Sequence, residues 1–412
     1  MEGTIMNRCF LAGCAAAALA MGAGDANAQA KYEIKIGGDA FFEAGFVNQD
    51  LDSGLRSTEF RNRFRVHITP VAKADNGLEY GGRIRIRASG SDTGVNADRA
   101  FIFAQGRLGE VRLGVSNSFN DETFISTPGD YLPTSIIDLD QVTNWVGPTT
   151  AGQSVNPANG RYQGSDVLGG VAEAVNAASI LWPSLTPDAN ATKIVYFSPR
   201  FAGVQFGASY TPRNDSFNQD VNRLKASSAI ANQGVTNSFA NLVEVGANYD
   251  GNVFGFDVKA SAGYFWGTSS DSTVAADSFR DLNAWQVGAQ LGYAGFAVGG
   301  SYTSFGKSGQ NKRPGFFADD MYNWTAGVQY TAGAIVVGAN YKYGVDPGSM
   351  LDPGSRRVTA YEVGAGYTVA SGLTVNAQYD YVLSNSDRPE TAATGSPDDK
   401  AHVIVLRTVL AF

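Results

Sequence analysis

Cysteine is almost absent from this 412-residue chain, and both cysteines that it has, Cys9 and Cys14, lie within its first 28 residues. Those residues combine a basic start, a short alanine-rich apolar run and the small-residue sequence Ala26-Asn27-Ala28, which is typical of a secretory signal. We therefore predict a signal peptide over residues 1–28 and a mature chain over residues 29–412. Because the mature chain would contain no cysteine, disulfide bonds and cysteine-based metal sites are excluded there.

Long apolar segments and a positive net charge are also missing. After residue 28 no run of about 18 apolar residues occurs, so the sequence predicts no transmembrane helix. The whole chain has 31 basic and 39 acidic residues. A net acidic chain is a poor partner for nucleic acid, which we exclude as a ligand.

Histidine is scarce as well, and this argues against catalysis. The chain has 2 histidines, His67 and His402, and neither lies beside a nucleophile motif such as Gly-x-Ser-x-Gly. A hydrolase would need a nucleophile with a base placed against it. We therefore predict that the protein is not an enzyme and has no catalytic residues.

What the sequence does have is arginine at every second residue in two neighbouring stretches, 61–65 and 83–87, with Ile84 and Ile86 between the arginines of the second. Successive side chains of a strand point to opposite faces, so each stretch has one charged face and one apolar face. A soluble sandwich would bury the apolar face in a core. A transmembrane barrel would turn it toward lipid and the arginines toward a water-filled lumen.

The connections between the alternating segments favour the barrel. Reading for period-two alternation gives about sixteen candidate strands. Short connections such as Gly251-Asn252 and Ala294-Gly295 alternate with long polar ones, of which the longest is 117–191. An up-and-down barrel sorts its loops in this way, with tight turns on one rim. We therefore predict an all-β fold, a transmembrane up-and-down antiparallel β-barrel of about sixteen strands.

The faces of most predicted strands are consistent with lipid outside. In 283–293, for example, Trp285 and Leu291 share one face while Gln286 and Gln290 share the other. An arginine on the lipid face near mid-membrane would cost about 2–4 kcal/mol. The strand predicted over 97–107 has no clear polar face, and its register stays open, with contact to a neighbouring subunit as one alternative.

The end of the chain and one hairpin carry a family resemblance. Phe412 closes an alternating final strand, and Ser198-Pro199-Arg200-Phe201-Ala202-Gly203 joins two others. On these features the mature chain resembles Gram-negative general diffusion porins of the alphaproteobacterial type. The resemblance implies a homotrimer embedded in outer-membrane lipid, without a cofactor. It also implies that the third long loop, 117–191, folds into the lumen as a constriction loop.

The charges of the predicted lumen suggest how such a channel would work. From Leu113 to Gly160 there is no lysine or arginine, so an acidic loop would face a basic wall and set up a transverse field. An alternative is that the arginines only pair with lumen acids such as Glu59 and Glu79. The predicted basic wall is Arg61, Arg63, Arg65, Arg83, Arg85, Arg87 and Arg112, and the predicted loop acids are Asp121, Glu122, Asp130, Asp138 and Asp140.

We predict a water-filled outer-membrane channel for passive diffusion of small hydrophilic solutes and ions. The alternative is a solute-selective channel for oxyanions or organic acids, since arginines can hold oxyanions bidentately. An adhesive or purely structural wall protein would be a third class. Asp138 and Asp140 also leave open a bound calcium ion, a hard cation that prefers oxygen ligands.

Overall fold

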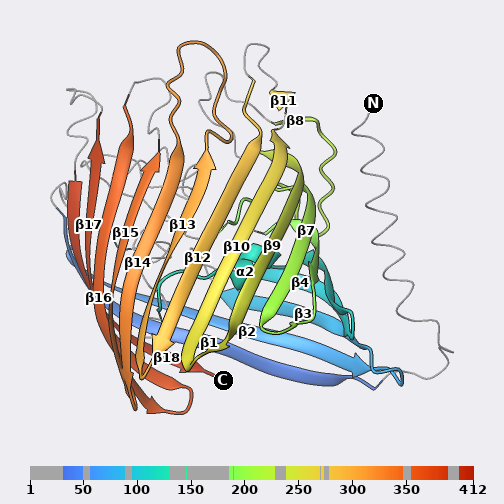
Figure 1. Cartoon of the computed structure of the whole chain (residues 1–412), viewed down its shortest axis with the longest axis horizontal. Helices are drawn as coiled ribbons and strands as arrows, with labels where there is room; N and C mark the ends of the chain where they lie inside the picture. The colour runs from blue at the N-terminus through green and yellow to red at the C-terminus, as the bar shows by residue number, and fades with distance from the viewer. Residues whose placement is uncertain are drawn as a thin grey trace.

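Sixteen strands join edge to edge into one closed antiparallel barrel, in which β1 pairs with β18 and chain neighbours otherwise pair with each other (Figure 1). The computed structural model describes residues 31–49, 56–88, 95–129, 145, 185–188, 190–227, 238–269, 271–272, 278–346, 354–387 and 399–412. The barrel strands are β1 (Glu33–Gln49), β2 (Thr58–Lys73), β3 (Glu79–Ala88), β4 (Val95–Gly106), β5 (Gly109–Val115), β6 (Thr192–Phe197), β7 (Val204–Arg213), β9 (Phe239–Val253), β10 (Phe256–Ser269), β12 (Leu282–Tyr293), β13 (Phe296–Gly306), β14 (Met321–Ala332), β15 (Ile335–Asp346), β16 (Arg356–Ala370), β17 (Leu373–Ser386) and β18 (Asp399–Ala411).

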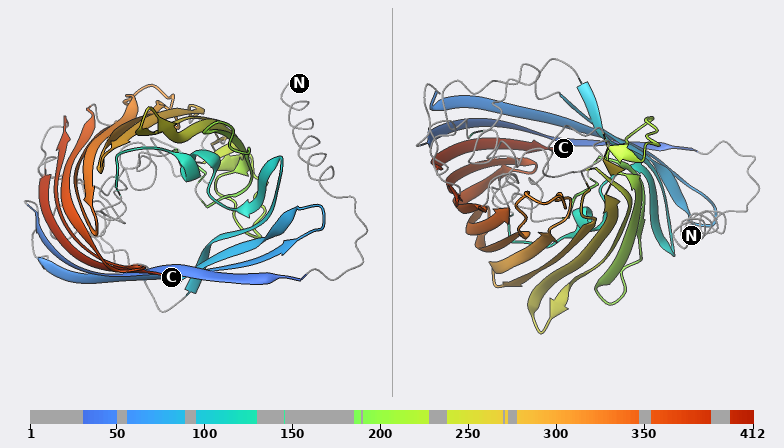
Figure 2. Two further views of the ribbon diagram at one scale, coloured as in Figure 1. Left: turned by 60° about the horizontal axis from the view of Figure 1, so that its bottom comes forward. Right: turned by 90° about the horizontal axis from the view of Figure 1, so that it is seen from above.

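Two short strands and one helix in the described ranges are not members of this ring of strands. The strands β8 (Ala226–Ser227) and β11 (Asp271–Ser272) form a small parallel pair, which the sequence did not predict. The helix α2 (Phe119–Thr123) lies inside the ring in both views of Figure 2. None of the helices in the described ranges is both long enough and apolar enough to cross a membrane.

The predicted sorting of loops is confirmed. The turn predicted at Gly251-Asn252 is wrong in position, because these residues pair with β10 and Phe254-Gly255 makes the turn from β9 to β10. Ala294-Gly295 joins β12 to β13 as predicted, and the residues of both turns have positive φ, between 50° and 89°. Two-residue turns with positive φ at both positions match the twist of paired strands, and glycine adopts this conformation without strain. These tight turns gather at one rim, and the long connections leave from the other (Figure 1).

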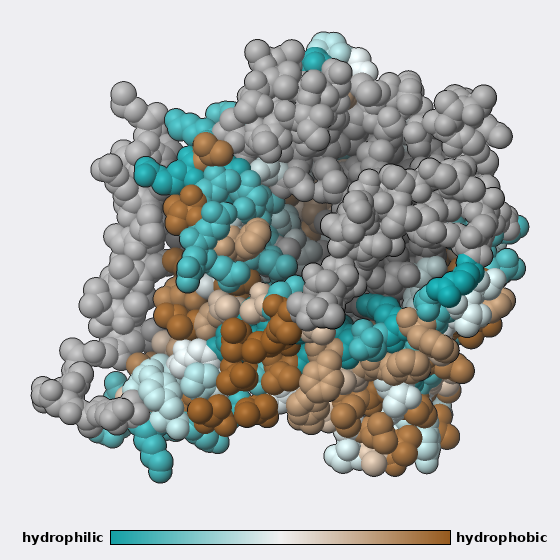
Figure 3. All heavy atoms as spheres, turned by 180° about the vertical axis from the view of Figure 1, so that it is seen from behind, coloured by the Kyte–Doolittle hydropathy of each residue, from teal (hydrophilic) through white to brown (hydrophobic). Residues whose placement is uncertain are grey.

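The predicted orientation of the faces is also confirmed. In β12 the side chains of Trp285 and Leu291 are 41% and 44% exposed on the outside of the barrel, whereas Gln286 is 1% exposed on the inside. Figure 3 shows apolar residues gathered on the described part of the surface toward the rim of short turns. An exposed apolar exterior around a polar interior reverses the usual order of a soluble protein and fits a lipid surrounding.

The open register of the predicted strand 97–107 is settled by a bulge in β4. Arg85 pairs with Arg99 but the next residue, Ile86, pairs with Ala97, so Asp98 is the extra residue. Beyond the bulge Phe101 faces the interior, where the Arg112 guanidinium lies 5.4 Å from its ring centroid. The extra residue interrupts the period of two, which explains why no polar face is visible in the sequence.

The seam between the first and last strands is closed by a buried ion pair. Glu43 of β1 and Arg407 of β18 are register partners, and their carboxylate oxygen and Nε lie 2.7 Å apart. Both side chains are at most 1% exposed. Arg61 approaches the other oxygen of Glu43 at 3.3 Å. The carboxylate therefore joins three adjacent strands, β18, β1 and β2.

Candidate functional site

The arginines of β2 line the interior of the barrel and share carboxylates of β1. Arg63 and Arg65 approach the two oxygens of Asp39 at 2.8 and 2.9 Å, and each of the three side chains is 21–23% exposed. Arg61 contacts Glu43 across the same pair of strands. Pairing of this kind lowers the repulsion that closely spaced guanidinium groups would otherwise have.

The arginines of β3 gather around the bulge in β4. The Arg85 guanidinium donates two hydrogen bonds to Asp98, at 2.6 and 2.8 Å, and Arg87 approaches the same carboxylate at 3.3 Å. Arg83 donates to the hydroxyl of Thr69 at 3.3 Å. The acids named in the sequence alternative have other partners: Glu59 pairs with Arg56 and Glu79 pairs with Lys73.

The helix α2 brings two of the predicted loop acids to the basic wall. Asp121 lies 3.9 Å from Arg99 of β4, and Glu122 lies 3.5 Å from Arg112 of β5. Arg112 also contacts Glu110 at 2.7 Å. Arg99 was not predicted, because the bulge hides its place in the arginine stripe. The other predicted loop acids, Asp130, Asp138 and Asp140, lie outside the described residues.

Burial raises the pKa of Asp121 from its ordinary value of 3.8 to about 6, against the opposing effect of the Arg99 guanidinium. The side chain is 17% exposed, close to the buried ion pair between Lys193 and Asp188, whose atoms lie 2.8 Å apart. Charge at this point of the interior therefore depends on pH in the range around 6.

The far side of α2 is anchored to the barrel wall by Glu244 of β9. Its carboxylate accepts hydrogen bonds from the backbone N–H groups of Phe119 and Asn120, at 3.0 and 2.6 Å, and from the hydroxyl of Ser209. The Phe119 ring is fully buried and packs against Phe197 with centroids 5.4 Å apart. An acceptor for the first N–H groups of a helix fixes its start and its direction.

From the start of α2 to Thr127 the chain lies along a track of glycines on the inner wall. A side chain at any of these positions would collide with residues between Phe119 and Thr127, so only glycine leaves room for the loop. Hydrogen bonds hold the loop along the track, among them Ile125 N to the Ser261 hydroxyl at 2.7 Å and Gln290 to the Ser126 carbonyl at 3.0 Å. The glycines are Gly207 of β7, Gly246 of β9, Gly263 of β10, Gly288 of β12, Gly299 of β13 and Gly327 of β14.

The sequence analysis did not identify this track. Its signal is a glycine at an inward position of six strands that follow one another in the barrel. One residue from the middle of the long loop is described: Trp145, whose ring lies against Gly45 of β1 and leaves no space for a side chain there. The interior thus combines a basic wall over β2–β5 with an acidic helix held by β7, β9 and β10, which follow β6 in the barrel (Figure 2).

Comparison with known proteins gives one family. Residues 15–387 match the family described as Gram-negative porin. Among curated proteins, an uncharacterized protein of Rickettsia conorii is 24% identical over 75% of this chain and 78% of its own length. An uncharacterized protein of Rickettsia felis is 23% identical over the same shares.

Solved structures share the fold at low sequence identity. The E1M, A104W mutant of Rh. blastica porin is 18% identical, with a TM-score of 0.52 over 92% of this chain and all of that chain. A loop L8 deletion mutant of OmpT, an outer membrane protein of Vibrio cholerae, is 12% identical, with a TM-score of 0.56 over 92% of this chain and 99% of that one.

Proposed function

Since this chain belongs to the Gram-negative porin family, we propose that its interior passes small hydrophilic solutes and ions along the basic wall and past α2. Membership confirms three predictions: a Gram-negative porin, a location in the outer membrane, and a diffusion channel instead of an enzyme. The finer proposal is that the wall arginines and the acids of α2 form the constriction.

One observation carries this proposal: α2, with its acids Asp121 and Glu122, lies inside a closed barrel whose interior is lined by the arginines of β2 and β3. Opposed charges across a narrow water-filled section create a transverse field that orients water and dipolar solutes. An apolar solute would have to disrupt that ordered water. Passage would therefore favour small polar molecules.

The pairing of the wall supports general diffusion over an oxyanion-selective channel. Asp39, Glu43 and Asp98 each pair with two arginines, so much of the attraction for a passing anion is already balanced. A homotrimer remains part of the proposal. Planar-bilayer recordings of the refolded protein should show conductance steps in groups of three if each particle carries three pores.

Neutralising the arginines of β3 with R83Q, R85Q and R87Q together should shift ion selectivity toward cations. Asp98 would lose both of its guanidinium partners. A unit charge about 7 Å away changes the energy of an ion by about 0.6 kcal/mol in bulk water, with opposite sign for a cation and an anion. Removing one charge should therefore raise the cation-to-anion permeability ratio about eightfold, and removing three should raise it more than tenfold even when salt screens part of the effect. The measurement is the reversal potential in a salt gradient.

A control variant, K31Q with K73Q and K307Q, removes the same charge from exposed residues away from α2. Its reversal potential should stay at the wild-type value. If the arginine variant also keeps the wild-type value, these side chains do not line the narrow section.

Selectivity should also depend on pH through Asp121. With a pKa of about 6, its carboxyl is ionised at about pH 8 and largely protonated at about pH 5. Acidification therefore removes one negative charge opposite Arg99 and should move the reversal potential toward anions. The D121N channel should have the anion-shifted reversal potential at about pH 8 and also at about pH 5, because its side chain carries no charge at either pH.

His67 lies close enough to Arg65, Arg83 and Arg85 to feel their charges, and protonating it would also favour anions. The variant H67Q separates the contributions of His67 and Asp121 to the pH dependence of the reversal potential. If Asp121 causes that dependence, the H67Q channel should keep it. A wild-type response in D121N would assign the response to another group.

A further inference from the structure

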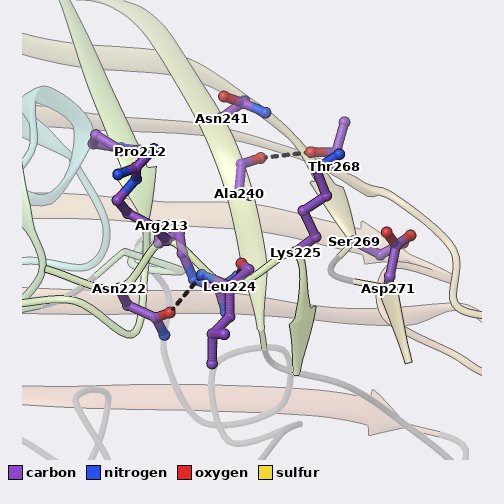
Figure 4. Close-up of a pocket in the computed structure, with 11 residues that line it drawn as sticks. Pro212, Arg213, Asn222, Leu224, Lys225, Ala240, Asn241, Thr268, Ser269 and Asp271 are labelled. Atoms are coloured by element: carbon purple, nitrogen blue, oxygen red, sulfur yellow. Dashed lines mark hydrogen bonds between the residues drawn. The ribbon is translucent and has the colours of Figure 1, made fainter. Parts of the chain in front are cut away.

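A pocket of about 460 Å³ opens at the rim of long loops, above β7, β9 and β10 (Figure 4). Its floor includes Pro212, Asn241 and Thr268. The neighbours of these three residues, Thr211, Leu242 and Gly267, are buried on the inner side of the barrel. Because successive side chains alternate along a strand, the three residues of the floor point outward. The floor of the pocket therefore faces the surroundings of the barrel, while Arg213 and Ala240 of its lining have the inward register of Thr211 and Leu242.

The walls of the pocket are two loops held in a defined arrangement. Arg213, 6% exposed, donates to both oxygens of Asp215 at 2.6 Å and to the carbonyl of Leu224. The parallel pair of β8 and β11 then joins the two loops, with Asp271 N donating to the Lys225 carbonyl at 2.8 Å. Figure 4 shows the lining residues converging from these loops and strands.

The lining of the pocket offers cations and neutral hydrogen-bond donors. Arg223 and Lys225 are exposed, and neither makes an ion pair with any residue in the described ranges. Because Arg213 is balanced by Asp215, the acid that opposes these two cations among the lining residues is Asp271. Asn241 accepts a hydrogen bond from the Tyr210 hydroxyl at 3.2 Å, which leaves its amide N–H groups to donate.

Apolar side chains flank the same pocket. Val221 and Leu224 of the 214–227 loop are 76% and 69% exposed, which is unusual for a polar loop in water. On the outer face of β10, Tyr264 and Trp266 are 41% and 37% exposed just below Thr268. Aromatic side chains at a strand end mark the boundary between hydrocarbon and head groups. The pocket thus lies at the level of the head groups, with apolar residues beside it for acyl chains.

We propose that this pocket binds the phosphorylated head group of a lipid of the outer leaflet. Arg223 and Lys225 would contact phosphate oxygens, Asn241 would donate a hydrogen bond, and Val221 and Leu224 would lie along the acyl chains. This combination of two cations that have no ion pair in the described ranges with exposed apolar neighbours on a lipid-facing surface favours an anionic lipid over a soluble anion.

The test uses the refolded mature protein in detergent, titrated with bisphosphorylated lipid A and followed by native mass spectrometry. R223Q with K225Q should weaken binding about thirtyfold, since each basic residue near an anionic lipid surface contributes about 1 kcal/mol. D271N removes the opposing acid and should strengthen binding about fivefold. The matched control, K307Q with K312Q, removes two exposed cations from another long loop and should leave affinity unchanged.

Two outcomes would overturn the proposal. One is wild-type affinity for lipid A in the R223Q, K225Q variant; the other is displacement of lipid A by inorganic phosphate at equal concentration, which would indicate a site for a free anion. Planar-bilayer conductance serves as the folding check, because the floor of the pocket faces away from the lumen. Loss of lipid binding with normal conductance supports the site, and failure of lipid binding in the wild type would leave the channel proposal standing.

Discussion

Replacing Arg407 with leucine should lower the free energy of unfolding of the barrel by about 3–5 kcal/mol, the usual result of leaving one partner of a buried ion pair alone. Glu43 would keep its negative charge with no exposure to water, and its remaining cation, Arg61, is 3.3 Å away. The loss falls on the seam between β1 and β18, where the barrel closes. Urea unfolding in lipid vesicles, followed by tryptophan fluorescence, measures it.

The double variant E43L with R407L is the matched control, because apolar residues often replace a buried ion pair without loss. The free energy of unfolding of this double variant should be close to that of the wild type, although Arg61 no longer has the Glu43 carboxylate beside it. If R407L unfolds at the wild-type urea concentration, the seam is held by its backbone ladder and apolar contacts without the ion pair.

Most of the barrel can be predicted from the sequence because its physical constraint is local. A strand between lipid and water must alternate at every residue, so β12 at Leu282–Tyr293 nearly coincides with the predicted segment 283–293. The tight turn at Ala294-Gly295 was also visible as a pair of small residues. Face, turn and loop class all follow from neighbours in the chain.

The site is harder to predict because its contacts are distant in the chain. Asp98 becomes the partner of Arg85 only through a bulge, and the same bulge hides Arg99. Glu244 holds Phe119 from 125 residues away. Nothing local to either residue indicates that contact. The period of two predicts which side a residue faces, but not which residue it meets across the lumen.

The ion pairs of the wall bear on the alternative that the charges left open. The dense arginine stripe allowed an oxyanion-selective channel, but Asp39 and Asp98 each pair with two guanidinium groups. In the structure α2 contacts this wall through Asp121 and Glu122 and is anchored by Glu244 of β9.

The position of α2 should therefore depend strongly on Glu244, and E244L should raise single-channel conductance and make the open current noisy. Leucine leaves the N–H groups of Phe119 and Asn120 buried without their acceptor. Each such group costs about 1–3 kcal/mol, so the docked population of the helix should fall at least tenfold. Planar-bilayer recording measures the conductance, and liposome swelling with sugars of increasing size measures the exclusion limit.

E244Q should give a smaller effect, since its amide keeps one oxygen to accept from either N–H group. E59L is the matched control: it removes a glutamate of β2 that pairs with Arg56 and does not touch α2, so its conductance should equal that of the wild type. If E244L conducts like the wild type with the same exclusion limit, the glycine track and the contacts of Ile125 and Ser126 hold the loop without the carboxylate. The track would then be the feature that sets the width of the channel, because those contacts span β10, β12, β13 and β14.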